Sequence, residues 1–113
     1  MCYVLDASAF IHGHDVRLFK GVLYTTPQVI EELKDPVSRA LVEVVNVVVV
    51  DVDREKIDEL LNKFKDLSIA DASALALALE KGCVLITDDS GLTNAAKRLG
   101  VRVERIFYRR RDR

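Results

Sequence analysis

Residues 68–89 read SIADASALALALEKGCVLITDD and combine a predicted helix, a predicted strand and four acidic residues in one run. Ser68 followed three residues later by Asp71 is a capping-box pattern, which predicts the start of a helix. The helix is apolar on nearly every side over Ala72–Leu79, so we expect it in the interior of a layered fold. The next segment, Cys83–Ile86, has no polar position, which is typical of a strand covered on both faces.

Strands and helices alternate along the rest of the chain. Apolar runs predict further strands at Cys2–Leu5, Val22–Tyr24, Val47–Val50 and Val101–Val103, and the β-branched run Val47–Val50 is expected to be buried on both faces. Helical spacing of apolar residues predicts helices along Val29–Val37 with a break at Pro36, along Ile57–Phe64 and along Leu92–Leu99. We therefore predict an α/β fold, a three-layer α/β/α sandwich around a parallel sheet.

The composition fits one domain and excludes a polycation built to coat nucleic acid. The 113 residues are 50% hydrophobic and carry a formal net charge of −1. The charge is uneven, because residues 102–113 hold six arginines against two acids. We predict a folded domain over residues 1–108 and a basic tail over residues 109–113.

The apolar segments predict a soluble cytoplasmic protein without membrane association. Asp6 interrupts the first apolar run, unlike a secretion signal. The longest apolar stretch, near Val44–Val50, is far below the roughly 20 residues of a membrane helix. Cys2 and Cys83 lie in apolar runs, which is typical of buried free thiols, and no Cys or His spacing suggests zinc.

Acidic residues follow the predicted strands at the edge of the sheet where ligands bind. In open parallel sheets, ligands bind outside the carboxyl ends of the strands. Asp6 directly follows the first strand, Asp88 and Asp89 directly follow the fourth, and Asp71 lies in the first turn of the apolar helix. Converging carboxylates repel one another unless a cation lies among them, and a set of oxygen donors suits Mg²⁺ or Mn²⁺.

Each acid also has a purely structural interpretation. Asp6, Asp71 and Asp89 could each cap a helix, and Glu31 and Glu32 could form a solvated helix face. At about 100° per residue, Glu32 lies nearer the apolar stripe than Glu31 does, so Glu32 is the better choice for an inward role. Independent caps need not all fall on one edge of a sheet, and that coincidence favours a functional site.

Four segments form an ordered set of motifs: Asp6–Ile11, Val29–Leu33, Leu67–Asp71 and Leu85–Asp89. Over nearly the whole chain, this set resembles the PIN-domain ribonucleases. The resemblance implies a divalent-metal endoribonuclease whose catalytic carboxylates, which hold Mg²⁺ or Mn²⁺, are Asp6, Glu32, Asp71 and Asp89. It makes Asp88 a neighbouring metal ligand.

The resemblance also implies supporting residues around the acids. Side chains that orient carboxylates or waters would be Ser8, Thr87 and Asn94. An acidic site repels RNA, so the substrate needs basic anchors, and those available are Arg105, Arg109, Arg110 and Arg111.

Two groups within that family fit the motifs. Tyr24–Asp35 and Thr87–Asn94 resemble the Nob-type endonucleases, which mature the 3′ end of small-subunit rRNA in a pre-ribosomal particle. Those proteins usually continue into a zinc ribbon, for which this chain has no cysteine pairs. The alternative is a VapC-type toxin, a single PIN domain that pairs with an antitoxin protein. The residues of these motifs favour the Nob-type role in rRNA processing over the toxin role.

Two other classes fit less well. A phosphoacceptor receiver domain places paired acids after the first strand and an acceptor after the third, whereas the pair here follows the fourth strand and Asp51 is a weak acceptor. A PIN fold that has lost activity and serves as a binding module would not need the intact set of acids.

Overall fold

The computed structural model describes residues 1–11 and 19–105 of the chain. Its strands are β1 (Cys2–Leu5), β2 (Val22–Thr25), β3 (Val48–Val49), β4 (Val84–Ile86) and β5 (Val103–Glu104). Its helices are α1 (Ala7–Ile11), α2 (Pro27–Glu32), α3 (Pro36–Val44), α4 (Arg54–Lys63), α5 (Ile69–Lys81) and α6 (Ser90–Arg98).

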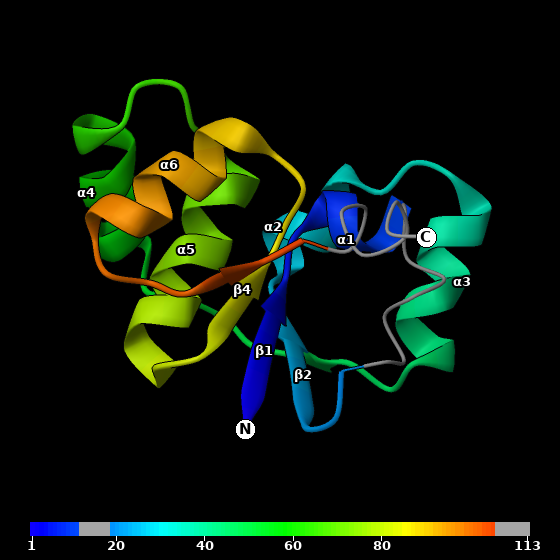
Figure 1. The fold of residues 1–113 in the computed structure, drawn as a ribbon. Helices are drawn as coiled ribbons and strands as arrows, with labels where there is room; N and C mark the ends of the chain where they lie inside the picture. The colour runs from blue at the N-terminus through cyan, green and yellow to red at the C-terminus, as the bar shows by residue number, and fades with distance from the viewer. Residues whose placement is uncertain (12–18, 106–113) are drawn as a thin grey trace.

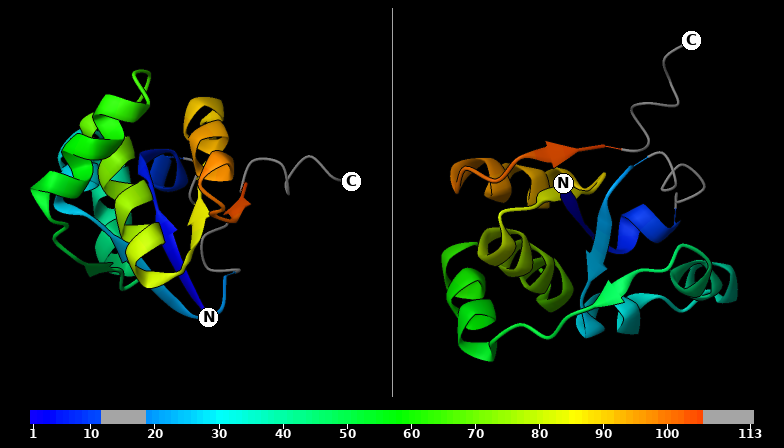
Figure 2. Two further views of the ribbon diagram at one scale, coloured as in Figure 1. Left: turned by 90° about the vertical axis from the view of Figure 1, so that its left-hand side faces the viewer. Right: turned by 90° about the horizontal axis from the view of Figure 1, so that it is seen from below.

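The strands form one parallel sheet in the order β3-β2-β1-β4-β5. Helices α4, α5 and α6 lie on one side of this sheet, and α1 and α3 lie on the other (Figure 1, Figure 2). The predicted three-layer α/β/α sandwich is therefore confirmed. The chain first builds the sheet from β1 toward β3 and later continues outward from β4, so the strand order reverses between β1 and β4. In open parallel sheets, ligands bind at such a switch point, outside the carboxyl ends of the strands.

Helix α5 is the central helix of the core, as its apolar sequence predicted. Every residue from Ala72 to Ala78 is buried, and α5 packs against both β1 and β4. Leu75 and Leu77 are fully buried. None of the helices that the structure describes is both long and apolar enough to span a membrane.

Local sequence signals set the ends of several helices. Ser68 and Asp71 form the predicted capping box at the start of α5, and Gly82 ends that helix in the left-handed conformation, with φ of 66°. Thr26 caps α2, where Pro27 occupies the first turn and loses no helical hydrogen bond. Pro36 separates α2 from α3, as predicted.

Two predictions about apolar segments are wrong. Strand β3 spans only Val48–Val49, and each of these side chains is 46% exposed, because β3 is an edge strand rather than an interior one. Val37 was expected on the buried face of the helix before it, but it is 77% exposed. The break between α2 and α3 resets the helical phase, so the stripe that begins at Val29 does not continue across Pro36.

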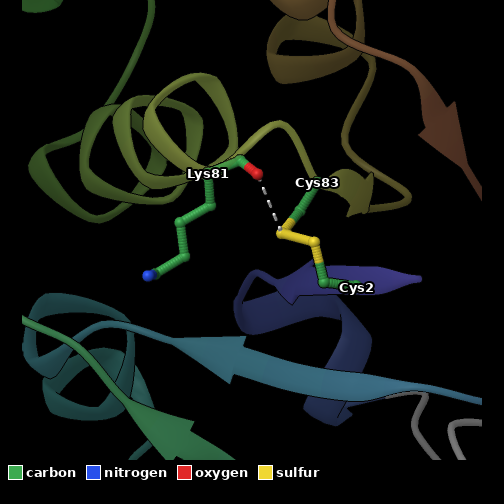
Figure 3. The surroundings of a disulfide bond; sticks show 3 residues. All are labelled: Cys2, Lys81 and Cys83. Atoms are coloured by element: carbon green, nitrogen blue, oxygen red, sulfur yellow. Dashed lines mark hydrogen bonds between the residues drawn. A yellow bond between two sulfur atoms is a disulfide. The ribbon is translucent and has the colours of Figure 1, made fainter.

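The prediction of two free thiols is also wrong, because Cys2 and Cys83 form a disulfide (Figure 3). Strands β1 and β4 are neighbours in parallel register, with Tyr3 opposite Val84. That register brings the two cysteines opposite each other at the amino ends of the strands, with their Cα atoms 5.0 Å apart. The disulfide therefore links the two central strands at the end of the sheet away from the acids.

Candidate active site

The carboxylate of Asp6 lies at the switch point between β1 and β4. Asp6 is 3% exposed, and its backbone N–H donates to the Ile86 carbonyl at the end of β4. Its Oδ1 accepts hydrogen bonds from the Ser8 hydroxyl at 2.8 Å and from the Ala9 N–H at 3.1 Å. Its Oδ2 accepts one from the Thr87 hydroxyl at 2.5 Å. Three donors from both strand ends thus hold this carboxylate in one orientation.

The same two hydroxyls also hold the turn after β4. Ser8 Oγ accepts a hydrogen bond from the Asp88 N–H at 2.9 Å, and Thr87 Oγ1 accepts one from the Asp89 N–H at 3.0 Å. Each hydroxyl therefore donates to Asp6 and accepts from the turn, which couples the position of the turn to the Asp6 carboxylate. These contacts are what a role in orienting carboxylates requires of Ser8 and Thr87.

Asp71 and Asp89 cap helices, as their structural interpretation predicted. Asp89 precedes α6, and its Oδ2 accepts a hydrogen bond from the Leu92 N–H at 2.8 Å. Asp71 Oδ2 accepts one from the Ser68 N–H at 3.1 Å. Capping and ligand binding are compatible, because a carboxylate has two oxygens with several lone pairs.

The three aspartates influence one another electrostatically. Burial raises the pKa of Asp6 to about 6, and the negative charge of Asp71 adds to the rise. The three hydrogen bonds to Asp6 act in the opposite direction. Burial also raises the pKa of Asp71, and the charge of Asp89 contributes. The site therefore concentrates negative charge that the hydrogen bonds do not fully offset, which favours a bound cation.

Glu32 lies at the end of α2, beside the start of α5. Both Glu31 and Glu32 are exposed and line one surface hollow with Ile69 and Ala70, which directly precede Asp71. The structure thus brings the predicted glutamate to the same end of α5 as Asp71. Because both acids line the hollow, the choice of Glu32 over Glu31 stays a prediction.

The donor chemistry fits a hard divalent ion, although the acids are not gathered into a ready ligand set. In residues 1–11 and 19–105, no three His, Cys, Asp or Glu side chains converge closely enough to hold a metal ion. The available donors are carboxylate oxygens, and a buried carboxylate with a raised pKa is stabilised by a nearby cation. The metal-ligand roles of the acids therefore stay a prediction.

Arg105 and Asp88 form a contact at the rim of the site. The Arg105 guanidinium donates to the Asp88 carbonyl at 3.1 Å, and its Nε lies 4.0 Å from Asp88 Oδ1. Asp88 is thus engaged with a cation of the chain, and the RNA-binding role of Arg105 stays a prediction. Asn94 is exposed on α6. The remaining predicted RNA contacts, Arg109, Arg110 and Arg111, lie outside the described residues.

A buried pair of hydroxyls, which the sequence did not predict, joins the start of α2 to α5. The oxygens of Thr26 and Ser73 lie 2.7 Å apart, and both residues are fully buried. Ser73 Oγ also donates to the Ala70 carbonyl, and Thr26 Oγ1 accepts from the Val29 N–H. The pair fixes the start of α2 against the first turns of α5. A lone serine within an alanine–leucine helix was the signal that could have revealed it.

The fold and these side chains define a class of protein: a small parallel α/β domain with acids at the switch point between its central strands. A family model described as a PIN domain matches residues 13–108, which include Glu32, Asp71 and Asp89. The chain belongs to the PIN-domain family, as its motifs predicted.

The chain is similar to several ribonucleases of archaea. It is 40% identical over 112 residues to Endoribonuclease Nob1 of Methanocaldococcus jannaschii, covering 93% of this chain and 56% of that protein. It is 38% identical over 109 residues to Endoribonuclease Nob1 of Pyrococcus abyssi, covering 88% and 65%. It is 36% identical over 121 residues to Ribonuclease VapC3 of Aeropyrum pernix, covering 94% and 86%. The chain therefore spans between half and two thirds of these two Nob1 relatives.

Solved structures share the fold. A PilT N-terminus domain protein from Sulfolobus solfataricus P2 superposes with a TM-score of 0.68 at 21% identity, covering 96% of this chain and 89% of that one. The protein PAE2754 from Pyrobaculum aerophilum gives a TM-score of 0.67 at 25% identity, covering 89% and 87%.

Proposed function

We propose that this protein is a metal-dependent endoribonuclease that matures the 3′ end of small-subunit rRNA in a pre-ribosomal particle. The observation that carries the nuclease proposal is the buried Asp6 at the β1–β4 switch point, electrostatically linked to Asp71, which is in turn linked to Asp89. The similarity to Nob1 endoribonucleases supports the rRNA role. We place the activity in the cytoplasm.

The chemistry assigned to the site is hydrolysis of a phosphodiester. The residues that would hold Mg²⁺ or Mn²⁺ are Asp6, Glu32, Asp71 and Asp89, with Asp88 as a neighbouring ligand. When bound there, a divalent ion lowers the pKa of a coordinated water and offsets negative charge on the phosphate. Ser8 and Thr87 keep the Asp6 carboxylate in one orientation, so little rearrangement is needed when substrate arrives.

The RNA backbone would be held by cations at the rim of the acidic site. Arg105 contacts the turn that carries Asp88 and is 44% exposed at its side chain, so its guanidinium can reach a phosphate while it stays near the acids. Arginine contacts to phosphate are independent of sequence and weaken as salt rises. We assign the same role to the arginines of residues 109–111, and Asn94 is assigned to water or carboxylate positioning.

A VapC-type toxin that pairs with an antitoxin protein is the second candidate. The similarity to Ribonuclease VapC3, whose own length is 86% covered, favours it. Expression in a bacterial host separates the two. Growth arrest that depends on Asp6 would refute the rRNA role and support the toxin, whereas normal growth together with cleavage at the 3′ boundary of a small-subunit rRNA precursor supports our proposal.

The nuclease activity is tested with purified protein, short RNA and either Mn²⁺ or Mg²⁺. Asp89→Asn should abolish cleavage, and the matched control Asp58→Asn, an exposed aspartate on α4 paired with Arg54, should retain it. Either ion should raise the melting temperature of the wild type, since it binds only the folded site. Full cleavage in excess chelator, or by Asp89→Asn, would refute the proposed chemistry.

A further inference from the structure

A surface hollow of about 490 Å³ lies between the end of α2 and the start of α5. The residues that line it are Gln28, Glu31, Glu32, Lys34, Ile69 and Ala70. It directly adjoins the proposed active site, because Ala70 precedes Asp71 and Glu32 is itself a proposed metal ligand. A molecule held in this hollow would therefore lie beside the reacting phosphate.

The side-chain amide of Gln28 is the feature that points to a ligand. Its Oε1 is buried, and no group in the described part of the chain donates a hydrogen bond to it. A buried acceptor without a donor is destabilising, and an incoming N–H removes that cost. The terminal torsion of a glutamine side chain is soft, so the amide can turn toward the hollow without a change of backbone.

The charges of the hollow exclude a phosphate and favour a neutral group. Two carboxylates, from Glu31 and Glu32, face one ammonium, from Lys34, so the net charge of the hollow is negative. Ile69 is 44% exposed and offers an apolar surface to a flat ring. Acceptor oxygens beside an apolar surface suit a nucleobase, and specific RNA recognition commonly uses unstacked bases held in such pockets.

We propose that this hollow binds the base of a nucleotide next to the scissile phosphate, and that Gln28 accepts a hydrogen bond from an exocyclic amine of that base. This inference rests on the proposed nuclease function. Adenine and cytosine each present an amine donor beside a ring-nitrogen acceptor, which pairs with both ends of the glutamine amide. Uracil presents a single ring N–H between two carbonyl oxygens and has no exocyclic amine, and the carboxylates of the hollow repel those oxygens, so we expect uracil to bind less tightly.

The test is binding of short single-stranded RNA, measured by fluorescence polarisation with labelled oligo(A), oligo(C) and oligo(U). The wild type should bind oligo(A) and oligo(C) about tenfold more tightly than oligo(U), the factor expected from one well-placed hydrogen bond. Gln28→Met keeps the length of the side chain, removes the amide and should abolish this preference. The matched control is Asn62→Leu, which removes an exposed amide from α4 and should keep the preference.

A second variant changes a residue at the start of α5 that lines the same hollow. Ile69→Ser alters a side chain that is 44% exposed, so it tests the apolar surface even if Gln28→Met fails to fold. It should weaken binding of oligo(A) more than binding of oligo(U). A preference for amine-bearing bases that survives in both variants would overturn the proposal, and so would equal wild-type affinity for the three oligomers.

The outcome also separates this inference from the nuclease proposal. Cleavage with Mn²⁺ that shows no base preference would overturn the base-binding role and leave the nuclease standing. Selective binding that depends on Gln28, without cleavage under any divalent ion, would support the base-binding hollow and refute the proposed activity.

Discussion

The buried Asp6 should make the folded protein less stable at neutral pH than at mildly acidic pH. Its pKa is 3.8 in the ordinary case and about 6 in the folded protein, because the site is desolvated and Asp71 is near. Between these values the folded state keeps a proton that the unfolded state has already lost. Stability contributed by the neutral carboxyl is therefore present below about pH 4 and is lost as the pH rises through about 6.

Asp6→Asn removes this penalty without changing the shape of the side chain. The shift from 3.8 to about 6 corresponds to about 3 kcal/mol at neutral pH, since one pKa unit is worth about 1.4 kcal/mol. The asparagine oxygen can accept from Ser8 and Ala9, and the Thr87 hydroxyl can turn to accept from the new amide. The variant should be inactive and more stable, by up to about 3 kcal/mol, or roughly 10 °C in melting temperature.

The measurement is urea unfolding of both proteins from about pH 4 to about pH 8. The stability difference, variant minus wild type, should grow with pH up to about 7 and then stay level. Asp35→Asn is the control, because hydrogen bonds from Ser38 lower the pKa of the exposed Asp35 from its ordinary value of 3.8, so the effect of this substitution should stay level across this pH range and change only at lower pH. A difference for Asp6→Asn that does not change with pH would refute the reasoning.

Three further predictions concern stability and RNA binding. Reduction of the Cys2–Cys83 disulfide, which spans 81 positions of sequence, should lower the free energy of unfolding by about 4–5 kcal/mol, and an unchanged urea midpoint in reductant would contradict this. Thr87→Val should lower the free energy of unfolding by about 1–3 kcal/mol and move the acidic limb of the pH–rate profile to higher pH. The Thr87 hydrogen bond lowers the pKa of Asp6, so its loss should raise that pKa; an unmoved profile would argue against a positioning role. Arg105→Gln should change the free energy of unfolding by less than about 1 kcal/mol, but it should reduce the slope of log Kd against log salt by about 1, the value for one phosphate contact. An unchanged slope would show that Arg105 does not contact RNA.

Much of the site could be predicted because its residues follow strands directly. Asp6 and Asp89 come within three residues of the ends of β1 and β4, and parallel strands all present their carboxyl ends at one edge. The two hydroxyls that hold Asp6 were also found, because Ser8 and Thr87 lie in the same short motifs. The role of Glu32 is harder to assign from sequence. An exposed residue on a helix can face several neighbours, whereas a residue directly after a strand must lie at one edge of the sheet.

The features that escaped prediction depend on which segments become neighbours. The hydroxyl pair of Thr26 and Ser73 spans 47 positions of sequence, and neither residue alone signals the other. Arg105 was predicted to meet RNA, but its contact with Asp88 arises because β5 lies next to β4. The exposure of Val48 follows from the position of β3 at the edge of the sheet, which a run of valines does not reveal.

The sequence by itself determined the elements, their caps and the chemistry at the strand ends, because helical and strand periodicity, proline and capping side chains act over a few neighbouring residues. Only the tertiary structure decided the strand order. That order places β1 beside β4, so that Asp6 meets Thr87 at one end of the sheet and Cys2 meets Cys83 at the other. Contacts between residues 81 positions apart depend on the packing of the whole sheet, and two cysteines in apolar runs look the same whether or not their strands are adjacent.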